Sequence, residues 1–240
     1  MKQYVIIVAG GKGIRFNSAV STPTSVPKQF LMLNDLPVLM HTVKRFHDYL
    51  TQCNEAGDII LVLPQDQIEY WQQLCAKHCF TIPHQIVTGG ETRSKSVVNG
   101  LNKVPDNTLV AIHDGVRPLI TIDLISRCFK QAGLTGSAIP TMPATDTLRH
   151  ITGKLIDRNT ILTVQTPQVF DSDKLKQAYN SQFSIFNFQF STFTDDASVY
   201  EAAGNKLTFI EGETSNIKIT RPFDLMLAKL WLSNIKENEL

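Results

Sequence analysis

Short runs of β-branched and other apolar residues alternate along this chain with segments of helical periodicity, and this alternation constrains the fold most strongly. Strand-like runs lie at 5–8, 59–63, 84–87, 109–112 and 137–139, and helical patterns lie at 37–46, 66–79, 92–101 and 122–132. Parallel strands need a crossover between them, and the crossover is usually a helix. The sequence therefore predicts an α/β fold with a doubly wound, mostly parallel, Rossmann-like sheet.

Length and composition fit one domain spanning residues 1–240. The chain has 240 residues, of which 42% are hydrophobic, enough to bury a full core. Its 23 basic and 22 acidic residues nearly cancel, so we expect any anion site to be local and expect neither a nucleic-acid nor a membrane partner. No signal-peptide pattern or long apolar stretch is present. The four scattered cysteines have the sequence context of buried helix positions and indicate free thiols, so we expect a cytoplasmic protein.

The strand and helix alternation breaks between residues 141 and 166. Two β-like segments, Thr147 to Ile151 and Leu155 to Ile156, flank the turn signal Thr152-Gly153-Lys154. The pattern favours a protruding β-hairpin arm over an unstructured loop of this length. Beyond it, the sequence predicts helices at 171–180 and 222–235, and another helix capped by Thr194.

The first strand-like run ends in Ala9-Gly10-Gly11-Lys12-Gly13-Ile14-Arg15. Glycines at the carboxyl end of a strand let backbone N–H groups approach a phosphate. The Walker pattern fails because no Ser or Thr follows Lys12, and the dinucleotide fingerprint fails at Phe16, although Asp35 stands where a ribose-binding acid would. A turn without a ligand and a phosphate loop both remain open, and the nearby cations Arg15 and Lys28 favour the phosphate loop.

Four further polar clusters follow strand-like runs, at 89–96, 113–118, 163–168 and 216–222. Singly, each has a structural explanation: Arg93 and Lys95 on a solvated helix face, an ion pair between Asp114 and Arg117, or Lys218 on the surface. The carboxyl ends of parallel strands meet at one edge of the sheet, so we expect these clusters to converge. Convergent cations beside a glycine loop indicate a polyphosphate ligand. The cations and the acid expected in one cleft are Arg15, Lys28, Asp114, Arg117 and Lys218.

Taken in order, these motifs resemble the 2-C-methyl-D-erythritol 4-phosphate cytidylyltransferase family of the non-mevalonate isoprenoid pathway. The resemblance covers nearly the whole chain. Its motifs match Gly11 to Arg15, Pro27-Lys28-Gln29, Gly89 to Ser96, His113 to Pro118, Asp146-Thr147, Asp157-Arg158, Thr166-Pro167-Gln168, Thr194-Asp195-Asp196-Ala197 and Asn216-Ile217-Lys218.

The resemblance implies transfer of CMP from CTP to 2-C-methyl-D-erythritol 4-phosphate, with release of pyrophosphate. It also implies Mg²⁺ carried mainly by the CTP phosphates, with no metal site formed by protein ligands, and a homodimer in which the 141–166 arm completes the partner's site. The implied catalytic residues are Arg15, Lys28, Arg158 and Lys218. The implied nucleotide-binding residues are Ala9, Gly10, Gly11, Gly13, Gly90, Glu91, Ser96, Asp114 and Gly115. The implied acceptor-binding residues are Asp114, Arg117, Thr147, Arg158, Thr166 and Lys218.

The chemistry of the acceptor agrees with this resemblance. A phosphate monoester has a second pKa of about 6, so at neutral pH it is a dianionic nucleophile that needs no general base. The residues depart from the family pattern in the insert Asn17 to Val26, which lengthens the spacing between Arg15 and Lys28, in Glu91 for Asp, and in Gly115 for Ala. Two alternatives stay open: transfer to another polyol phosphate such as ribitol 5-phosphate, and a nucleotide-binding protein without turnover.

Overall fold

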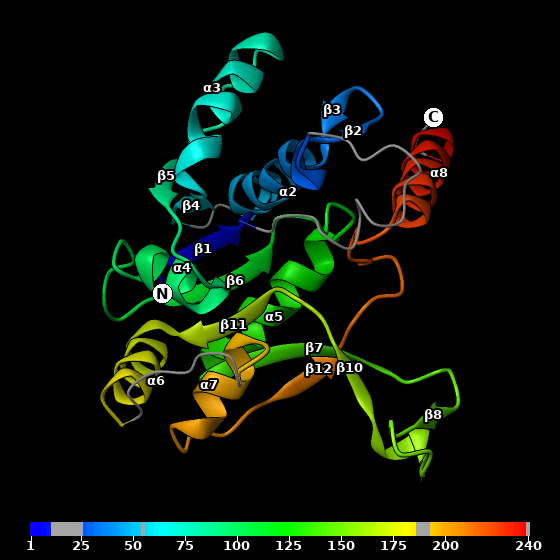
Figure 1. Ribbon diagram of the computed structural model, residues 1–240. Helices are drawn as coiled ribbons and strands as arrows, with labels where there is room; N and C mark the ends of the chain where they lie inside the picture. Colours follow the sequence, from blue (N-terminus) through cyan, green and yellow to red (C-terminus); the bar gives the residue numbers. More distant parts are fainter. Residues whose placement is uncertain (11–25, 54–55, 186–192, 239–240) are drawn as a thin grey trace.

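A computed structural model of the chain describes residues 1–10, 26–53, 56–185 and 193–238 (Figure 1). Its centre is an eight-stranded sheet in the order β10-β7-β11-β6-β1-β4-β5, with β12 also paired to β7. The predicted parallel strands form one half of this sheet, in which β5, β4, β1 and β6 run in parallel. These four strands are Gln85–Thr88, Ile59–Leu63, Gln3–Val8 and Leu109–Asp114, respectively.

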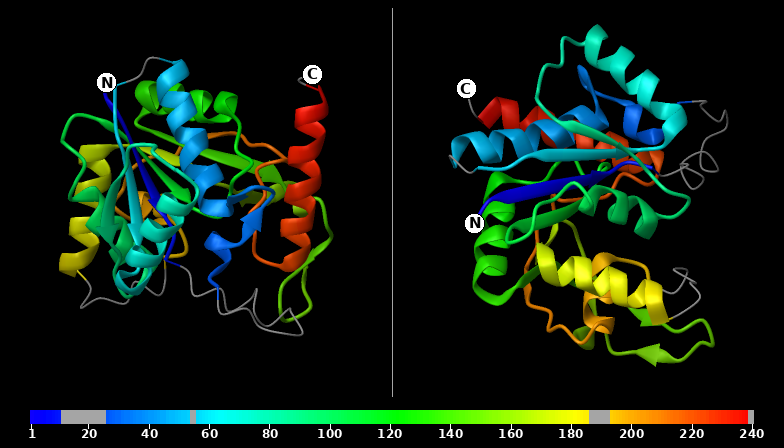
Figure 2. Two further views of the ribbon diagram at one scale, coloured as in Figure 1. Left: turned by 90° about the horizontal axis from the view of Figure 1, so that it is seen from above. Right: turned by 90° about the vertical axis from the view of Figure 1, so that its left-hand side faces the viewer.

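Helices cover both faces of the sheet, as predicted (Figure 2). Side chains alternate along β1, so Val5 and Ile7 join the core on one face while Tyr4 and Ile6 join the core on the other. The first face is covered by α2 (Val38–Gln52), α3 (Ile68–Lys77) and α5 (Ile122–Thr135). The second is covered by α4 (Arg93–Leu101), α6 (Ser172–Ile185) and α7 (Asp196–Ala202).

The other half of the sheet is mixed, which the sequence patterns did not predict. Strand β11 (Gln168–Asp171) lies antiparallel between β6 and β7 (Ser137–Pro143). Strand β12 (Phe209–Glu211) runs parallel to β7, and β10 (Leu162–Val164) runs antiparallel to it. An antiparallel strand inserted at this place ends the regular crossover pattern and brings the segment around Thr166 beside the end of β6.

The register changes between β10 and β11 along the same side of β7. Val164 pairs with Thr141, whereas Val169 pairs with Ala138, so the β10–β11 side carries two more residues than the β7 side. This bulge holds the Thr166–Pro167 bond, which is cis. Bulges of this kind redirect side chains near functional sites.

The predicted arm is present, and its hairpin is shorter than the 141–166 segment. Thr141 and Val164 are already paired within the central sheet. The projecting part holds the hairpin of β8 (Leu148–Arg149) and β9 (Leu155–Ile156), followed by the short helix η3 (Arg158–Thr160). In Figure 1 it extends away from the helical layers.

A third, smaller core lies beside the sheet. The C-terminal helix α8 (Pro222–Asn238) packs near the hairpin of β2 (Met32–Leu33) and β3 (Leu36–Pro37). Leu33, Val116 and Ile219 are buried there together. This core brings the segment containing Lys218 alongside the loop that follows β6.

Two local predictions need correction. The cap of α7 is Asp195, whose carboxylate accepts a hydrogen bond from Ser198 N, and not Thr194. The four cysteines are free as predicted, but Cys53 and Cys79 are exposed, although their sequence context had indicated buried helix positions. Within the described residues, no helix is both long and apolar enough to cross a membrane.

Candidate active site

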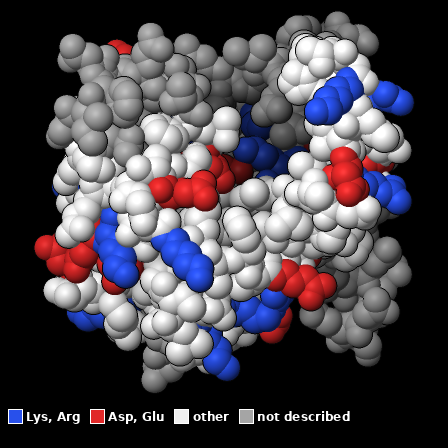
Figure 3. All heavy atoms as spheres, turned by 90° about the horizontal axis from the view of Figure 1, so that it is seen from below, with Lys and Arg blue, Asp and Glu red and all other residues white. Residues whose placement is uncertain are grey.

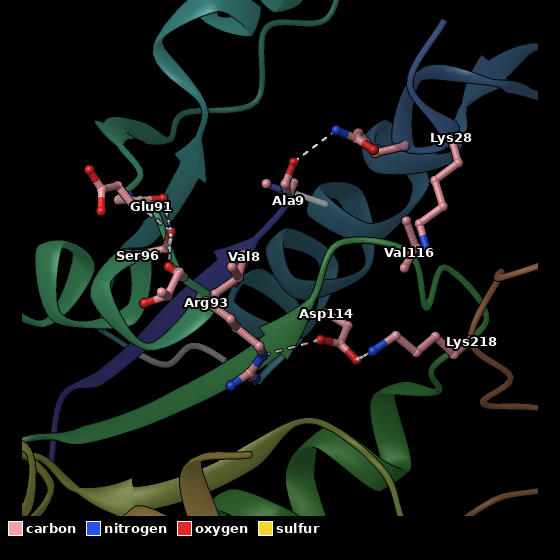
Figure 4. Close-up of a pocket in the computed structure, with 13 residues that line it drawn as sticks. Val8, Ala9, Lys28, Glu91, Arg93, Ser96, Asp114, Val116 and Lys218 are labelled. Carbon is pink, nitrogen blue, oxygen red and sulfur yellow. Dashed lines mark hydrogen bonds and ion pairs between the residues drawn. The ribbon is translucent and has the colours of Figure 1, made fainter. Parts of the chain in front are cut away.

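A cavity of about 260 Å³ opens at the carboxyl ends of β1 and β6, the edge predicted to bind a ligand (Figure 4). It lies between the loop before α4 and the segment that holds Lys218. The space-filling view in Figure 3 shows a hollowed face on which charges of both signs meet. The cavity is lined by Val8, Ala9, Gly10, Lys28, Gln29, Gly90, Glu91, Thr92, Arg93, Ser96, Asp114, Val116 and Lys218.

Lys28 reaches this cavity in spite of the insert that precedes it. It begins the short helix η1 (Lys28–Phe30), and its Nζ donates a hydrogen bond to Ile219 O at 3.1 Å. The adjacent Gln29 is buried, and its amide donates to Ala9 O at 2.9 Å. Gln29 therefore ties the end of β1 to η1, and this link fixes Lys28 at the mouth of the cavity.

The loop before α4 forms the opposite wall. Ser96 Oγ accepts from Gly90 N at 3.0 Å and donates to Thr92 O at 2.9 Å, while Thr92 caps the helix by accepting from Lys95 N. A Cβ on residue 90 would lie 2.2 Å from Lys95 Cγ, so only glycine allows this close turn. The loop consequently presents its backbone and the Ser96 hydroxyl toward the cavity.

Asp114 is the electrostatic centre of the site. Its Oδ2 lies 2.8 Å from Lys218 Nζ and 3.4 Å from Arg117 Nε, and its Oδ1 lies 3.8 Å from Arg93 Nε. Burial alone would raise the pKa of this carboxyl, but Arg93, Lys218 and Arg117 outweigh burial and lower its pKa below the ordinary value. Asp114 is therefore ionised at neutral pH and holds three cations around one carboxylate.

Behind Asp114, a buried histidine fixes the hydroxyl of Thr166. Thr166 Oγ1 accepts from Asp114 N at 3.1 Å and lies 3.2 Å from His113 Nδ1, while His113 Nε2 lies 3.2 Å from Arg117 O. A carbonyl can only accept, so Nε2 carries the proton and Nδ1 accepts from the Thr166 hydroxyl. Burial is the main cause that lowers the pKa of His113, to about 3, so the imidazole is neutral at physiological pH.

The structure brings together most of the predicted site residues that it describes. Arg117 and Thr166 stand directly behind Asp114. Gly115 lies below the cavity, where a Cβ would come within 2.9 Å of Ala9 Cβ and Leu39 Cδ1. The predicted residues that line the cavity are Ala9, Gly10, Lys28, Gly90, Glu91, Ser96, Asp114 and Lys218. Gly11, Gly13 and Arg15 lie outside the described residues.

The two predicted arm residues do not line this cavity. Thr147 and Arg158 are exposed, and Arg158 Nη1 donates to Thr145 O within the arm at 2.7 Å. Neither side chain therefore contributes to the cavity of its own chain.

Arg93 is the main residue that the sequence interpretation missed. Instead of lying on a solvated helix face, it lines the cavity and forms ion pairs with Asp114 and Asp196. The periodicity of α4 carries the signal, because Arg93, Ser96, Val97, Gly100 and Leu101 share one helical stripe whose later members are buried. Lys95, on the other side of the helix, is exposed.

The described residues offer a poor ligand set for a metal ion. They contain no group of three His, Cys, Asp or Glu side chains placed to hold one. Asp114, one of two carboxylates lining the cavity, is already neutralised by cations, and the other, Glu91, is exposed.

A doubly wound sheet with convergent cations at its carboxyl edge is typical of α/β proteins that bind nucleotides or other phosphates there. The family model described as "IspD: 2-C-methyl-D-erythritol 4-phosphate cytidylyltransferase" matches residues 3–234. The chain belongs to this family.

Known members of the family match nearly the whole length of the chain. Enzymes of this name from Bacteroides thetaiotaomicron and Porphyromonas gingivalis are each 46% identical to it, covering 97% of this chain and 100% and 99% of their own lengths. The crystal structure of the enzyme from Francisella tularensis aligns with a TM-score of 0.75 at 29% identity, over 96% of this chain and 99% of that one. The resemblance noted from the motifs is thus confirmed.

Proposed function

We propose that this protein transfers CMP from CTP to 2-C-methyl-D-erythritol 4-phosphate, giving 4-diphosphocytidyl-2-C-methyl-D-erythritol and pyrophosphate, in isoprenoid precursor biosynthesis. One observation carries the proposal: a chain of this family retains Lys28, Lys218 and Asp114 together in one cavity beside the end of β1. Lys28 and Lys218 supply the positive charge that a reaction between two phosphates requires, because the reactants repel each other, and Asp114 holds Lys218 in place.

In this reaction the phosphate oxygen of the acceptor attacks the α-phosphorus of CTP. A new oxygen–phosphorus bond forms, the bond to the bridging oxygen of the β-phosphate breaks, and that oxygen leaves with pyrophosphate. The acceptor is already a dianion near neutral pH, so no side chain has to remove a proton. The protein's task is to align the two phosphates and to offset the charge that develops, as in other phosphoryl transfers.

We assign different walls of the cavity to different parts of the two substrates. We assign the cytosine and ribose to the walls formed by Gly90, Glu91 and Ser96 and by Ala9 and Gly10. Lys28 binds the triphosphate, and we assign Arg15 to the same role. Lys218 and Asp114 hold the acceptor, Arg117 and Thr166 support them, and the bound Mg²⁺ belongs to the CTP phosphates.

We infer that the working enzyme is a homodimer joined through the arm, in a single-domain, cytoplasmic protein. Thr147 and Arg158 lie outside their own cavity, and the arm also exposes Ile151 and Leu155, which are 97% and 60% accessible. Exposed apolar side chains on a projecting hairpin support a protein interface. A partner's arm would supply Thr147 and Arg158 to each site.

Pyrophosphate release tests the reaction directly. Purified protein with CTP and Mg²⁺ is given 2-C-methyl-D-erythritol 4-phosphate or ribitol 5-phosphate, and we expect faster release with the first. Faster release with ribitol 5-phosphate would reassign the acceptor. CTP binding by calorimetry without release under either acceptor would indicate a binding protein instead.

Two substitutions test the assigned charges. Lys218→Ala and Arg158→Ala each remove one cation from the acceptor side, and we expect turnover to fall about a hundredfold or more. CTP binding, measured by calorimetry, should stay nearly unchanged, because both side chains are assigned to the acceptor. Unchanged turnover would remove the substituted residue from the site.

A further inference from the structure

Arg93 connects the catalytic cavity to a buried carboxylate that the proposed reaction does not use. It projects from the first turn of α4 toward Asp114, as Figure 4 shows. Its Nη2 donates to Asp196 Oδ2 at 2.7 Å, and its Nε lies 3.8 Å from Asp114 Oδ1. The guanidinium thus bridges two acids, one inside the core and one at the cavity.

Asp196 is held firmly in place by burial and hydrogen bonds. Its side chain is fully buried, and its Oδ1 accepts from Tyr179 Oη at 2.6 Å. Its backbone N donates to Gln168 Oε1 at 3.1 Å, which fixes the start of α7 against β11. A buried carboxylate with satisfied oxygens and a fixed backbone is a rigid anchor, so the guanidinium it binds is oriented as well.

The two oxygens of Asp114 have different surroundings. Oδ2 receives both Lys218 and Arg117, whereas Oδ1 faces Arg93 at 3.8 Å, beyond hydrogen-bond length. Among the described residues, Oδ1 therefore has its charge balanced while its lone pairs remain available to a ligand. An ionised carboxylate oxygen is an acceptor only, so the matching ligand group is a donor such as an alcohol.

We propose that Arg93 is a positioning residue: anchored by Asp196, it keeps Oδ1 of Asp114 directed into the cavity, where this oxygen accepts a hydrogen bond from a hydroxyl of the polyol phosphate. The inference rests on the proposed function. It extends the acceptor site beyond the side chains that touch the substrate, to the joint between α4, α6 and α7. An ion pair that served only to join these helices would affect stability but would not distinguish one substrate from the other.

A double-mutant cycle between Arg93→Gln and Asp114→Asn tests this role through the two Michaelis constants. We expect Arg93→Gln to raise KM for 2-C-methyl-D-erythritol 4-phosphate by about tenfold or more, the effect of one charged hydrogen bond, and to change KM for CTP by less than about twofold. In the Asp114→Asn background, Arg93→Gln should change the acceptor KM by less than about twofold, because its target oxygen is gone. Arg93→Lys keeps the charge without the planar guanidinium and should fall between Gln and wild type.

Two control variants separate positioning from stability. Tyr200→Phe removes the hydrogen bond from Tyr200 Oη to Gly136 O without touching Asp196, and Lys176→Ala breaks a remote ion pair with Asp106. Both should lower the thermal unfolding temperature without raising the acceptor KM selectively. If Arg93→Gln does not fold, Arg93→Lys and Asp196→Asn are measured in the same way.

Several outcomes would overturn the inference. They are an equal rise in both Michaelis constants, a loss of thermal stability alone, or effects of Arg93→Gln and Asp114→Asn that multiply independently. Normal wild-type turnover with an unchanged acceptor KM in Arg93→Gln rejects only the positioning role. Absence of wild-type turnover with every polyol phosphate rejects the proposed function and the positioning role together.

Discussion

At the scale of single residues, this site depends on charges and protons fixed by burial. His113 is fully buried between Phe46, Thr166 and Arg117 and works as a neutral connector, donating at one nitrogen and accepting at the other. Its protonated form would lose the bond from Thr166, because Nδ1 could no longer accept. The hydroxyl that faces Asp114 is therefore tied to the protonation state of a residue that never touches the substrate.

This burial predicts a stability that depends on pH. The unfolded chain binds a proton at His113 near its ordinary pKa of about 6.5, whereas the folded pKa is about 3. The stabilisation is thus present above pH 6.5 and is lost as the pH falls toward 3. Between pH 7 and 4.5, wild type should lose about 2–3 kcal/mol more of its free energy of unfolding than His113→Gln.

Urea unfolding at a series of pH values measures this difference. Gln keeps one donor and one acceptor, so the variant should fold, with a smaller dependence on pH. His150→Gln, a change at an exposed histidine of the arm, is the matched control and should follow wild type. Parallel pH curves for wild type and His113→Gln would contradict the prediction.

At the scale of elements, the predicted site residues lie on two separate parts of the structure. The cavity is built by β1, β6, α4 and the segment before α8, whereas Thr147 lies just before β8 and Arg158 begins η3. If the arm acts on its partner, each site contains Lys218 from one subunit and Arg158 from the other. The two residues can then be substituted in different subunits of the same dimer.

Subunit mixing tests this arrangement. Lys218→Ala and Arg158→Ala proteins are each expected to be nearly inactive, but a dimer with one of each has one site with both residues intact. An equal mixture, unfolded and refolded together, should recover about a quarter of wild-type turnover, because half of the dimers are mixed and each has one good site. No recovery, with mixed dimers shown by mass spectrometry, would place Arg158 in its own subunit's site.

At the scale of the whole molecule, the sequence predicted the parallel half of the sheet and both helical layers, because long periodic segments carry a clear signal. It did not predict β11, since four residues after a proline, Gln168 to Asp171, have too little periodicity to distinguish a strand from a turn. The clusters at strand ends were placed together by topology alone. Arg93 was left out of the predicted site because its cluster also fitted a solvated helix face. A site shared between subunits cannot be deduced from one chain's contacts.

The pairing of β7 with β10 makes the arm a removable module. Pro143 lies opposite Leu162, so the two ends of the projecting segment already stand side by side in the sheet. A two-residue Asn-Gly turn replacing 144–161 would close an ordinary hairpin. We expect such a chain to fold as a monomer that binds CTP by calorimetry yet does not transfer CMP; retained dimerisation in ultracentrifugation would contradict this. Because the β7–β10 pairing closes the base of the arm, one arm could be exchanged for another, by design or by evolution. The partner would then change without any change to the nucleotide site.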